Sequence, residues 1–254
     1  FVLRRLKKDV LRELPTKEER IVYSAASGRQ QKLYTASALK LKEALAGGAW
    51  SGNGKLEVLS QLMRLRQICC DPALCFEDYT GESAKLETCV SLIASASAAG
   101  HKILLFSQFA SMLERIRERL LQEGISSHLL VGATPKEERS RMVQAFASDE
   151  VPVFLISLKA GGTGLNLTAA DIVIHYDPWW NVAAQNQATD RAYRIGQEKP
   201  VTVYKLILKD TIEENLLKLQ NAKLALAAQV VSEGMVSLGD LSQNELMELF
   251  EQNP

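Results

Sequence analysis

The chain has 254 residues, of which 46% are hydrophobic, enough for the core of one large domain or of one domain with appendages. Thirty basic and thirty acidic side chains give a formal net charge of zero, so binding to a nucleic acid would need a local basic patch. No apolar run is long enough to cross a bilayer, and we therefore expect no membrane partner.

The start of the chain and its cysteines indicate a piece of a longer protein in a reducing compartment. The chain begins with Phe1 in a charged stretch, which we interpret as a piece of a longer protein that carries no signal peptide. Its cysteines lack the paired spacing of a zinc site, and no histidine lies near them in the sequence. We expect no metal site, and free thiols are typical of a reducing compartment.

The first part of the chain predicts a leading segment followed by a pair of helices. Residues 1–20 are charged and are expected on the surface. Leucines recur along residues 29–46 and again along residues 55–69, and a glycine-rich stretch at residues 47–54 separates the two predicted helices. Pro72 is expected to end the second helix, because proline cannot continue the hydrogen-bond pattern.

From residue 84 onward, helical patterns alternate with short apolar runs. Helices are predicted at residues 84–98, 110–123, 135–147 and 211–230, and strands at residues 103–106, 126–131, 152–157, 171–176 and 201–207. Thr134, followed by Pro135, is predicted to cap the third of these helices. Strands that alternate with helices imply a parallel sheet covered on both faces. Residues 238–252 predict a short amphipathic helix.

Three polar side chains recur at helical spacing after the strand predicted at residues 171–176. Gln187, Arg191 and Arg194 are separated by four and three residues. On a helix, that spacing would place all three on one face. The guanidinium fork of arginine matches phosphate oxygens, and two such forks could stabilise the charge that develops as a γ-phosphate leaves ATP. The alternative for an arginine pair is a solvated helix face.

A glycine-rich loop follows the strand predicted at residues 152–157. In Gly161-Gly162-Thr163-Gly164 the missing side chains let the backbone N–H groups approach an anion. A tight turn before Leu165 is the alternative. The loop lacks the third glycine of a dinucleotide-binding fingerprint.

Several stretches, in order along the chain, resemble the motifs of Swi/Snf-type ATPases of helicase superfamily two, which are DNA translocases and chromatin remodellers. They are residues 1–10 (FVLRRLKKDV), 102–109 (KILLFSQF), 153–167 (VFLISLKAGGTGLNL), 177–181 (DPWWN) and 187–197 (QATDRAYRIGQ). The resemblance runs from residue 1 to about residue 230. It implies an α/β fold: a RecA-like parallel sheet with helices on both faces, preceded by a helical insertion and followed by C-terminal helices.

The resemblance also implies three parts of the chain and a set of functional residues. The parts are an inter-lobe segment with a helical insertion (1–80), the second RecA-like helicase lobe (81–230) and a C-terminal helical extension (231–254). Arg191 and Arg194 would be arginine fingers. The residues expected to face ATP are Gly162, Gly164, Asn166 and Gln187, and those expected to contact the DNA backbone are Ser107, Gln108, Thr134, Arg139, Ser157 and Lys159.

Individual residues leave alternatives open. Gln108 could cap a helix instead of binding a phosphate, Arg139 could belong to a charged helix surface, and Lys159 could simply be solvated. Trp179 and Trp180 are expected to pack and hold the motif loops rather than stack on bases. His175 is expected to be a histidine with satisfied hydrogen bonds near a strand end.

Parts of an ATPase site are missing from this sequence. The nearest match to a phosphate-binding Walker loop, at Gly54-Lys55, has Ala49 in place of the first glycine, and no Asp-Glu-x-His box is present. We therefore expect ATP to bind with Mg²⁺ whose ligands lie in a first lobe, and the expected partners are that lobe, double-stranded DNA and a DNA-bound protein that is displaced or remodelled. The alternatives are an RNA helicase lobe and a nucleic-acid-binding module without hydrolysis. The compact insertion favours a bacterial, cytoplasmic, nucleoid-associated protein over a nuclear one.

Overall fold

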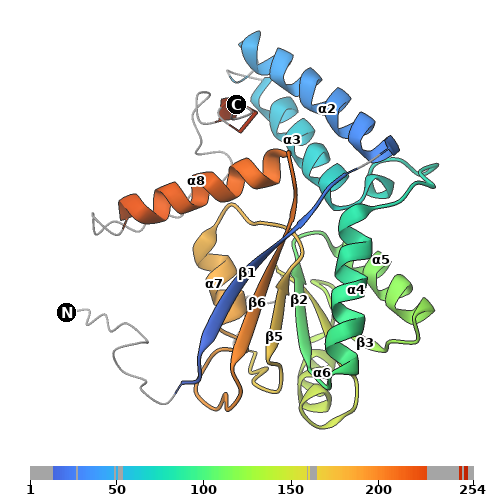
Figure 1. Cartoon of the computed structure of the whole chain (residues 1–254), viewed down its shortest axis with the longest axis vertical. Helices are drawn as coiled ribbons and strands as arrows, with labels where there is room; N and C mark the ends of the chain where they lie inside the picture. Colours follow the sequence, from blue (N-terminus) through green and yellow to red (C-terminus); the bar gives the residue numbers. More distant parts are fainter. Residues whose placement is uncertain are drawn as a thin grey trace.

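A six-stranded sheet forms the centre of the structure, and all of its strand pairs are parallel (Figure 1). The computed structural model describes residues 14–26, 28–48, 50, 54–158, 160, 165–227, 246–247 and 249–250, with the backbone alone for residues 222–227. The strands are β1 (Lys17–Ser24), β2 (Ile103–Ser107), β3 (Ser127–Leu130), β4 (Val153–Ser157), β5 (Ile172–His175) and β6 (Val201–Leu208). Their order across the sheet is β1-β6-β5-β2-β4-β3.

The central strands β2, β4 and β5 are buried along their whole length. Leu104 of β2 pairs with Phe154 of β4 on one side and with Val173 of β5 on the other. Their consecutive apolar residues fit this position, because a parallel strand with helices on both sides has no face open to water. The strands predicted for the second half of the chain are confirmed.

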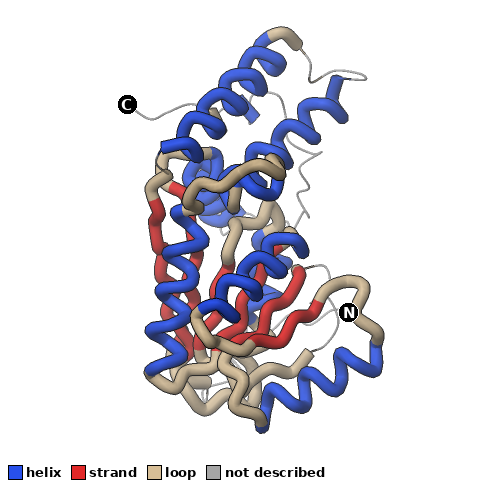
Figure 2. Tube along the Cα trace, turned by 90° about the vertical axis from the view of Figure 1, so that its right-hand side faces the viewer, coloured by secondary structure: helices blue, strands red, loops and turns tan. Residues whose placement is uncertain are grey.

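Helices cover both faces of the sheet. Helices α4 (Ala84–Ala98) and α5 (Ala110–Gln122) pack on the face that carries Leu105, whereas α6 (Lys136–Ser148) and α7 (Val182–Thr189) pack on the face that carries Leu104. Figure 2 shows the strands with helices on either side. The predicted fold class, a parallel sheet covered on both faces, is confirmed.

The predicted helical pair is also present, as α2 (Gly28–Ala46) and α3 (Gly54–Cys70), followed by the short 3-10 helix η1 (Pro72–Leu74). The pair packs with α8 (Ile212–Ala227) in a third hydrophobic cluster, to which Leu246 and Leu249 also belong. Figure 1 shows α2 and α3 beyond the end of the sheet at which β1 and β6 finish. Most of the helix predicted at residues 238–252 lies outside the described residues.

Strand β1 is an element that the sequence pattern does not predict. The pattern places residues 1–20 in a charged surface segment and predicts no strand before the helical pair, but Lys17–Ser24 pairs with β6 over its full length, from Lys17 opposite Val201 to Ser24 opposite Leu208. Most of the strand is exposed, and Lys205 of β6 donates to Glu19 at 2.8 Å. Because β1 lies at the edge of the sheet, its charged side chains remain in water, and such charges also discourage pairing with other chains.

The predicted helix cap at Thr134 is wrong. Pro135 occupies the position before α6, and the helix has no side-chain cap. The hydroxyl of Thr134 instead accepts a hydrogen bond from the backbone N–H of Val131 at 3.1 Å, and so closes the turn that precedes the helix. Among the helices described, none combines the length and the apolar character that a bilayer crossing needs.

Candidate functional site

The carboxyl ends of β2, β4 and β5 meet at one edge of the sheet, as the motif positions predicted. Ser107 and Ser157 are opposite each other in the register of β2 and β4. The backbone N–H of Tyr176, just after β5, donates to Phe106 O of β2 at 2.9 Å. In open parallel sheets this edge is where ligands bind, so the motif loops share the surface best placed to form a site.

Asp177 is the centre of a buried network at this edge. The residue is 1% exposed, and its side chain accepts hydrogen bonds from Ser107 Oγ at 2.5 Å and from Gln108 Nε2 at 2.5 Å. The backbone N–H of Gln108 also donates to Asp177, at 3.3 Å. Ser107 is fully buried, so in this conformation its hydroxyl holds Asp177 and is not open to a phosphate.

Gln108 is held from both sides. Besides its bond to Asp177, its Oε1 accepts a hydrogen bond from Arg66 Nη1 at 2.9 Å. The residue before α5 is Phe109, which has no side-chain cap bond, so the alternative that Gln108 caps a helix is wrong.

Arg66 of α3 is the residue that the sequence reasoning missed. Its side chain is buried, and its Nη2 donates to Pro178 O at 2.6 Å and lies 3.7 Å from Asp177 Oδ2. Its guanidinium carbon lies 5.5 Å from the centroid of the Trp180 ring. The sequence could have indicated its burial, because Arg66 is four residues after Leu62 and so lies on the apolar face of the predicted helix.

The two tryptophans of the Asp-Pro-Trp-Trp-Asn run pack as predicted. Trp179 contacts the sheet cluster under α7, and Trp180 contacts the cluster formed by α2, α3 and α8. The next residue, Asn181, caps α7 by accepting a hydrogen bond from Ala184 N at 3.1 Å. This run therefore determines where α7 begins.

The prediction that Gln187, Arg191 and Arg194 share one helix face is wrong. Helix α7 ends at Thr189, so that only Gln187 is helical, and it is exposed. The following backbone tightens, with Arg191 N donating to Ala188 O at 3.1 Å and Arg194 N to Ala192 O at 3.2 Å. We call residues 190–196 the arginine turn.

Tertiary contacts explain why the helix stops there. The backbone carbonyl of Arg191 accepts a hydrogen bond from Leu167 N at 3.1 Å, so it is bonded to the loop after β4. Gln197 Nε2 donates to the carbonyls of Ala170 at 2.8 Å and Ala192 at 3.1 Å, and Gly196 has a φ of +95°. These bonds fold the arginine turn back onto the loop after β4, and glycine permits the left-handed backbone that this requires.

Arg191 is a buried arginine, and one of its donors has no acceptor among the described residues. The residue is 6% exposed, and among the described residues its Nε has no hydrogen-bond partner. Burial, and then the neighbouring charge of Arg194, lower the pKa of Arg191 from its ordinary value, and the nearby carboxylate of Asp190 opposes them only in part. A buried and unpaired donor is costly, and such groups are found where a ligand supplies the missing acceptor. The guanidinium therefore suits an anion such as a phosphate.

The loop after β4 is described only in part. Gly162, Gly164 and Lys159 lie outside the described residues. Asn166 is exposed, and it stands between two residues that contact the arginine turn: Leu165 O accepts from Arg194 Nη1 at 3.5 Å, and Leu167 N donates to Arg191 O. The structure therefore brings Asn166 beside both arginines.

Arg139 of α6 joins the turn that precedes its own helix to the loop that follows β4. Its Nε donates to Thr134 O at 2.9 Å, its Nη2 donates to Gly132 O at 3.0 Å and its Nη1 donates to Ala160 O at 3.3 Å. The alternative of a merely charged helix surface is therefore wrong for Arg139. Ser157 is buried at the end of β4, and its expected DNA contact remains a prediction.

Only one of the two ring nitrogens of His175 has a hydrogen-bond partner among the described residues. Its Nε2 lies 2.8 Å from Thr189 Oγ1, but its Nδ1 has no partner among the described residues. Burial holds the pKa of His175 at about 3, so the ring is neutral at physiological pH. The described residues contain no cluster of side chains suited to a metal ion, and the four cysteines carry free thiols.

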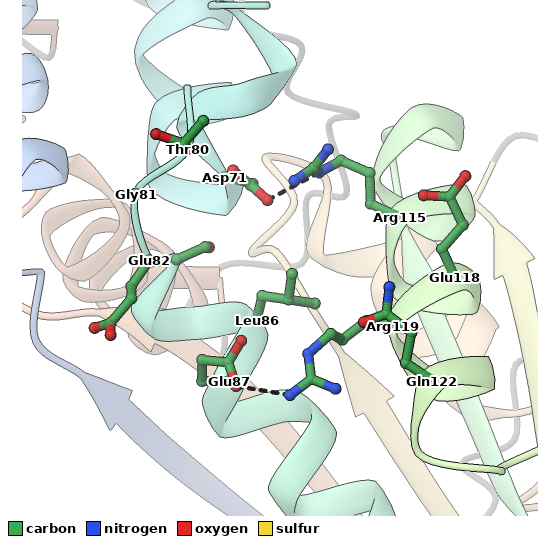
Figure 3. Close-up of a pocket in the computed structure, with 11 residues that line it drawn as sticks. Asp71, Thr80, Gly81, Glu82, Leu86, Glu87, Arg115, Glu118, Arg119 and Gln122 are labelled. Atoms are coloured by element: carbon green, nitrogen blue, oxygen red, sulfur yellow. Dashed lines mark hydrogen bonds and ion pairs between the residues drawn. The ribbon is translucent and has the colours of Figure 1, made fainter. Parts of the chain in front are cut away.

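A separate pocket of about 340 Å³ lies between α4, α5 and the loop after η1 (Figure 3). Figure 3 shows two ion pairs in its wall, Arg115 with Asp71 at 2.9 Å and Arg119 with Glu87 at 3.3 Å. None of the described site residues lines it. Its arginines already have carboxylate partners, so it has no counterpart to the Nε of Arg191, which lacks a hydrogen-bond partner among the described residues.

The parallel sheet and the motif loops at its carboxyl edge are those of a RecA-like helicase lobe. Residues 84–196 match the model of the helicase conserved C-terminal domain, and residues 1–74 match that of the SNF2-related domain. The C-terminal domain of a Sulfolobus solfataricus SWI2/SNF2 ATPase is 31% identical, with a TM-score of 0.75, and the match covers 94% of this chain and 100% of that one. The chain therefore belongs to the SWI2/SNF2 family, in which it is a C-terminal helicase lobe.

Two longer relatives give the wider context. The Sulfolobus solfataricus SWI2/SNF2 ATPase core in complex with double-stranded DNA is 33% identical, with a TM-score of 0.78, and the match covers 100% of this chain and 55% of that one. The putative ATP-dependent helicase/translocase YwqA of Bacillus subtilis is 41% identical over 98% of this chain and 28% of its own length. The chain spans about a quarter of the length of the curated relatives it matches.

Proposed function

We propose that this chain is the second motor lobe of an ATP-dependent translocase on double-stranded DNA. The observation that carries the proposal is Arg191, buried with a donor that lacks an acceptor among the described residues and placed beside Arg194. Support comes from the family and from the relative whose structure was solved with double-stranded DNA. The relatives described as ATP-dependent helicases support the use of ATP.

ATP would bind between this lobe and a first lobe, which would supply the phosphate-binding loop and the Mg²⁺ ligands. Arg191 and Arg194 would reach across as arginine fingers, and they fit this role because permanently charged forks stabilise the charge on a transferring phosphoryl group. Gly162, Gly164, Asn166 and Gln187 would face the nucleotide. Asn166 and Gln187 are exposed, which suits that role.

Contacts with the DNA backbone would come from the loops that follow β2 and β4 and from the segment around the start of α6. The residues proposed are Ser107, Gln108, Thr134, Arg139, Ser157 and Lys159. The burial of Ser107 and the bonds of Gln108 to Asp177 favour an indirect part for these two, which would hold the loop in place. Phosphate contacts give affinity without reading bases, as a motor that moves along any sequence requires.

The domain limits and the cellular role remain part of the proposal. We retain an inter-lobe segment with a helical insertion at 1–80, a lobe at 81–230 and a C-terminal extension at 231–254, with β1 as a strand that the first part contributes to the sheet. The partner acted upon would be a DNA-bound protein that is displaced or remodelled. The bacterial relatives support a cytoplasmic, nucleoid-associated protein over a nuclear one.

Stimulation of ATP hydrolysis tests the proposal and its rivals. This chain would be joined to a first lobe, and the steady-state rate would be measured with duplex DNA, with RNA and without nucleic acid. We expect strong stimulation by duplex DNA that Arg191→Ala abolishes. Stimulation by RNA alone would favour the RNA helicase lobe, and DNA binding without hydrolysis would favour the binding module.

A further inference from the structure

Arg66 connects parts of the chain that are far apart in sequence. It lies on α3, in the helical pair, 42 residues before Gln108 and 112 residues before Pro178. Gln108 follows β2 and Pro178 follows β5, so one side chain bonds to two motif loops at the carboxyl edge of the sheet. Figure 1 shows α3 crossing this end of the molecule.

The chemistry of the contact requires arginine. One nitrogen donates to Gln108 Oε1 at 2.9 Å and the other donates to Pro178 O at 2.6 Å, while Asp177 Oδ2 lies 3.7 Å away and balances the charge. A guanidinium holds its donors in a fixed plane and can span two acceptors, whereas an ammonium is a compact point charge. Because the side chain is buried, losing either contact leaves polar groups without partners.

A continuous series of bonds leads from Arg66 to the arginine turn. Pro178, which accepts from Arg66, precedes Trp179, whose N–H donates to Gln185 Oε1 of α7 at 3.3 Å. Asn181 caps the first turn of the same helix. At its other end Thr189 is bonded to His175, and the arginine turn follows directly. Since α7 spans only Val182–Thr189, a shift at its start reaches the arginines through little more than two helical turns.

We propose that Arg66 is a positioning residue that couples the α2–α3 helical pair to the loop of Gln108 and, through α7, to the arginine turn. It would transmit the position of the insertion to both the DNA side and the ATP side of the lobe. This inference rests on the proposed function for its catalytic consequence. Its structural part, the ordering of the two loops and of α7, stands apart from that function.

The test uses Arg66→Lys and Arg66→Met in the protein joined to a first lobe. Arg66→Lys keeps the charge and removes the fork, so it remains informative if Arg66→Met does not fold. We expect kcat of DNA-stimulated hydrolysis to fall by about tenfold or more, because small displacements of catalytic groups carry large rate penalties. We expect KM for ATP to change less than kcat, because among the residues proposed to face the nucleotide only Gln187 lies on α7.

Hydrogen–deuterium exchange provides a readout that does not depend on activity. Protection should be lost at the backbone N–H of Gln108 and of Trp179 and along α7, because those groups are ordered by the Arg66 contacts. Protection in α6 should be unchanged, since α6 packs beside the edge strand β3, which is separated from β5 by β2 and β4 in the strand order, and the bonds of Arg66 to Gln108 and Pro178 do not involve it.

The matched control is a second buried ion pair, Lys85 with Glu213, whose atoms are 2.5 Å apart. Lys85→Met combined with Glu213→Gln removes that pair, while the glutamine can still accept from Leu208 N. We expect the control to lose thermal stability and to keep kcat.

Three outcomes decide the proposal. Wild-type kcat and wild-type exchange in Arg66→Lys would overturn it, and so would a loss of kcat in the control as large as that in the Arg66 variants. If the wild-type protein shows no DNA-stimulated hydrolysis, the proposed function fails, and the exchange pattern still decides whether Arg66 positions the loops.

Discussion

His175 Nε2 and Thr189 Oγ1 lie 2.8 Å apart, and this bond joins the end of β5 to the last residue of α7. The arginine turn begins at the next residue. His175 also stacks on Phe106 of β2, with ring centroids 5.8 Å apart, so the ring is held between the sheet and the helix end. A neutral buried imidazole thus supports the segment that carries Arg191 and Arg194.

This arrangement predicts a pH dependence of stability. The pKa of His175 is lowered to about 3 in the folded chain, whereas an unfolded histidine titrates near about 6.5. Below the unfolded value the unfolded state binds a proton that the folded state does not, so the free energy of unfolding should fall as pH falls from about 6.5 toward 5, by at most about 1.4 kcal/mol per pH unit. Urea unfolding at several pH values would measure it.

The matched variant for that prediction is His175→Gln, which retains a polar group near Thr189 and does not titrate. Its stability should depend less on pH over the same window. The lowered pKa of Glu19, about 2, acts only at more acidic pH, because an unfolded glutamate titrates near about 4.3. Equal pH slopes for the two proteins would show that His175 does not stay neutral as described.

A trade between stability and activity is expected at Arg191. In Arg191→Met, an apolar side chain replaces a buried donor that has no partner among the described residues, and leaving such a donor unpaired costs about 1–3 kcal/mol. We therefore expect the melting temperature to rise by about 2–4 °C for each kcal/mol recovered. Hydrolysis by the protein joined to a first lobe should fall by about a thousandfold to a hundred-thousandfold.

Thermal unfolding and steady-state ATPase assays of the same preparations would measure both effects. Asn186→Ala, on the exposed side of α7, serves as the control and should change neither quantity much. A marked loss of stability in Arg191→Met would mean that Arg191 is structural, and a loss of activity below about tenfold would count against an arginine finger.

The chain by itself should not hydrolyse ATP. Its sequence contains neither a Walker loop nor an Asp-Glu-x-His box, so the groups that hold Mg²⁺ and activate water would have to come from elsewhere. A steady-state assay of the purified chain with duplex DNA should give only background. Turnover near that of the protein joined to a first lobe would contradict the assignment.

Binding of this lobe to duplex DNA should depend strongly on salt. The net charge is zero and the charged contacts proposed are Arg139 and Lys159, so the slope of log affinity against log salt should be about minus two. Lys159→Ala should flatten the slope by about one unit and weaken all sequences equally, because a phosphate contact reads no bases. Titration of a fluorescent duplex at several salt concentrations gives the slope.

Lys40→Ala, on the exposed side of α2, is the control for that titration and should leave the slope unchanged. If Lys159→Ala behaves like Lys40→Ala, or changes the preference among sequences, Lys159 is not the backbone contact proposed.

The parallel sheet and the family can both be predicted from the order of the amino acids. The apolar runs of β2, β4 and β5 predict strands buried on both faces, and the ordered motifs are specific because each requires particular residue types at set spacings. A local pattern of residues is enough to predict a helix or strand when the whole element is buried to the same degree. Such a pattern also suffices for the packing of Trp179 and Trp180, which large apolar rings next to a strand end predict.

Three features depend on contacts between distant parts of the chain: the edge strand β1, the partners of Arg66 and the end of α7. Strand β1 depends on β6, which lies far along the chain, because an exposed charged strand has no apolar pattern of its own. Arg66 finds its acceptors on two loops that the sheet brings together. Helix α7 ends where Leu167 and Gln197 bond to the carbonyls of Arg191 and Ala192. Residue spacing does not predict such long-range hydrogen bonds. These bonds determine the positions of Arg191 and Arg194.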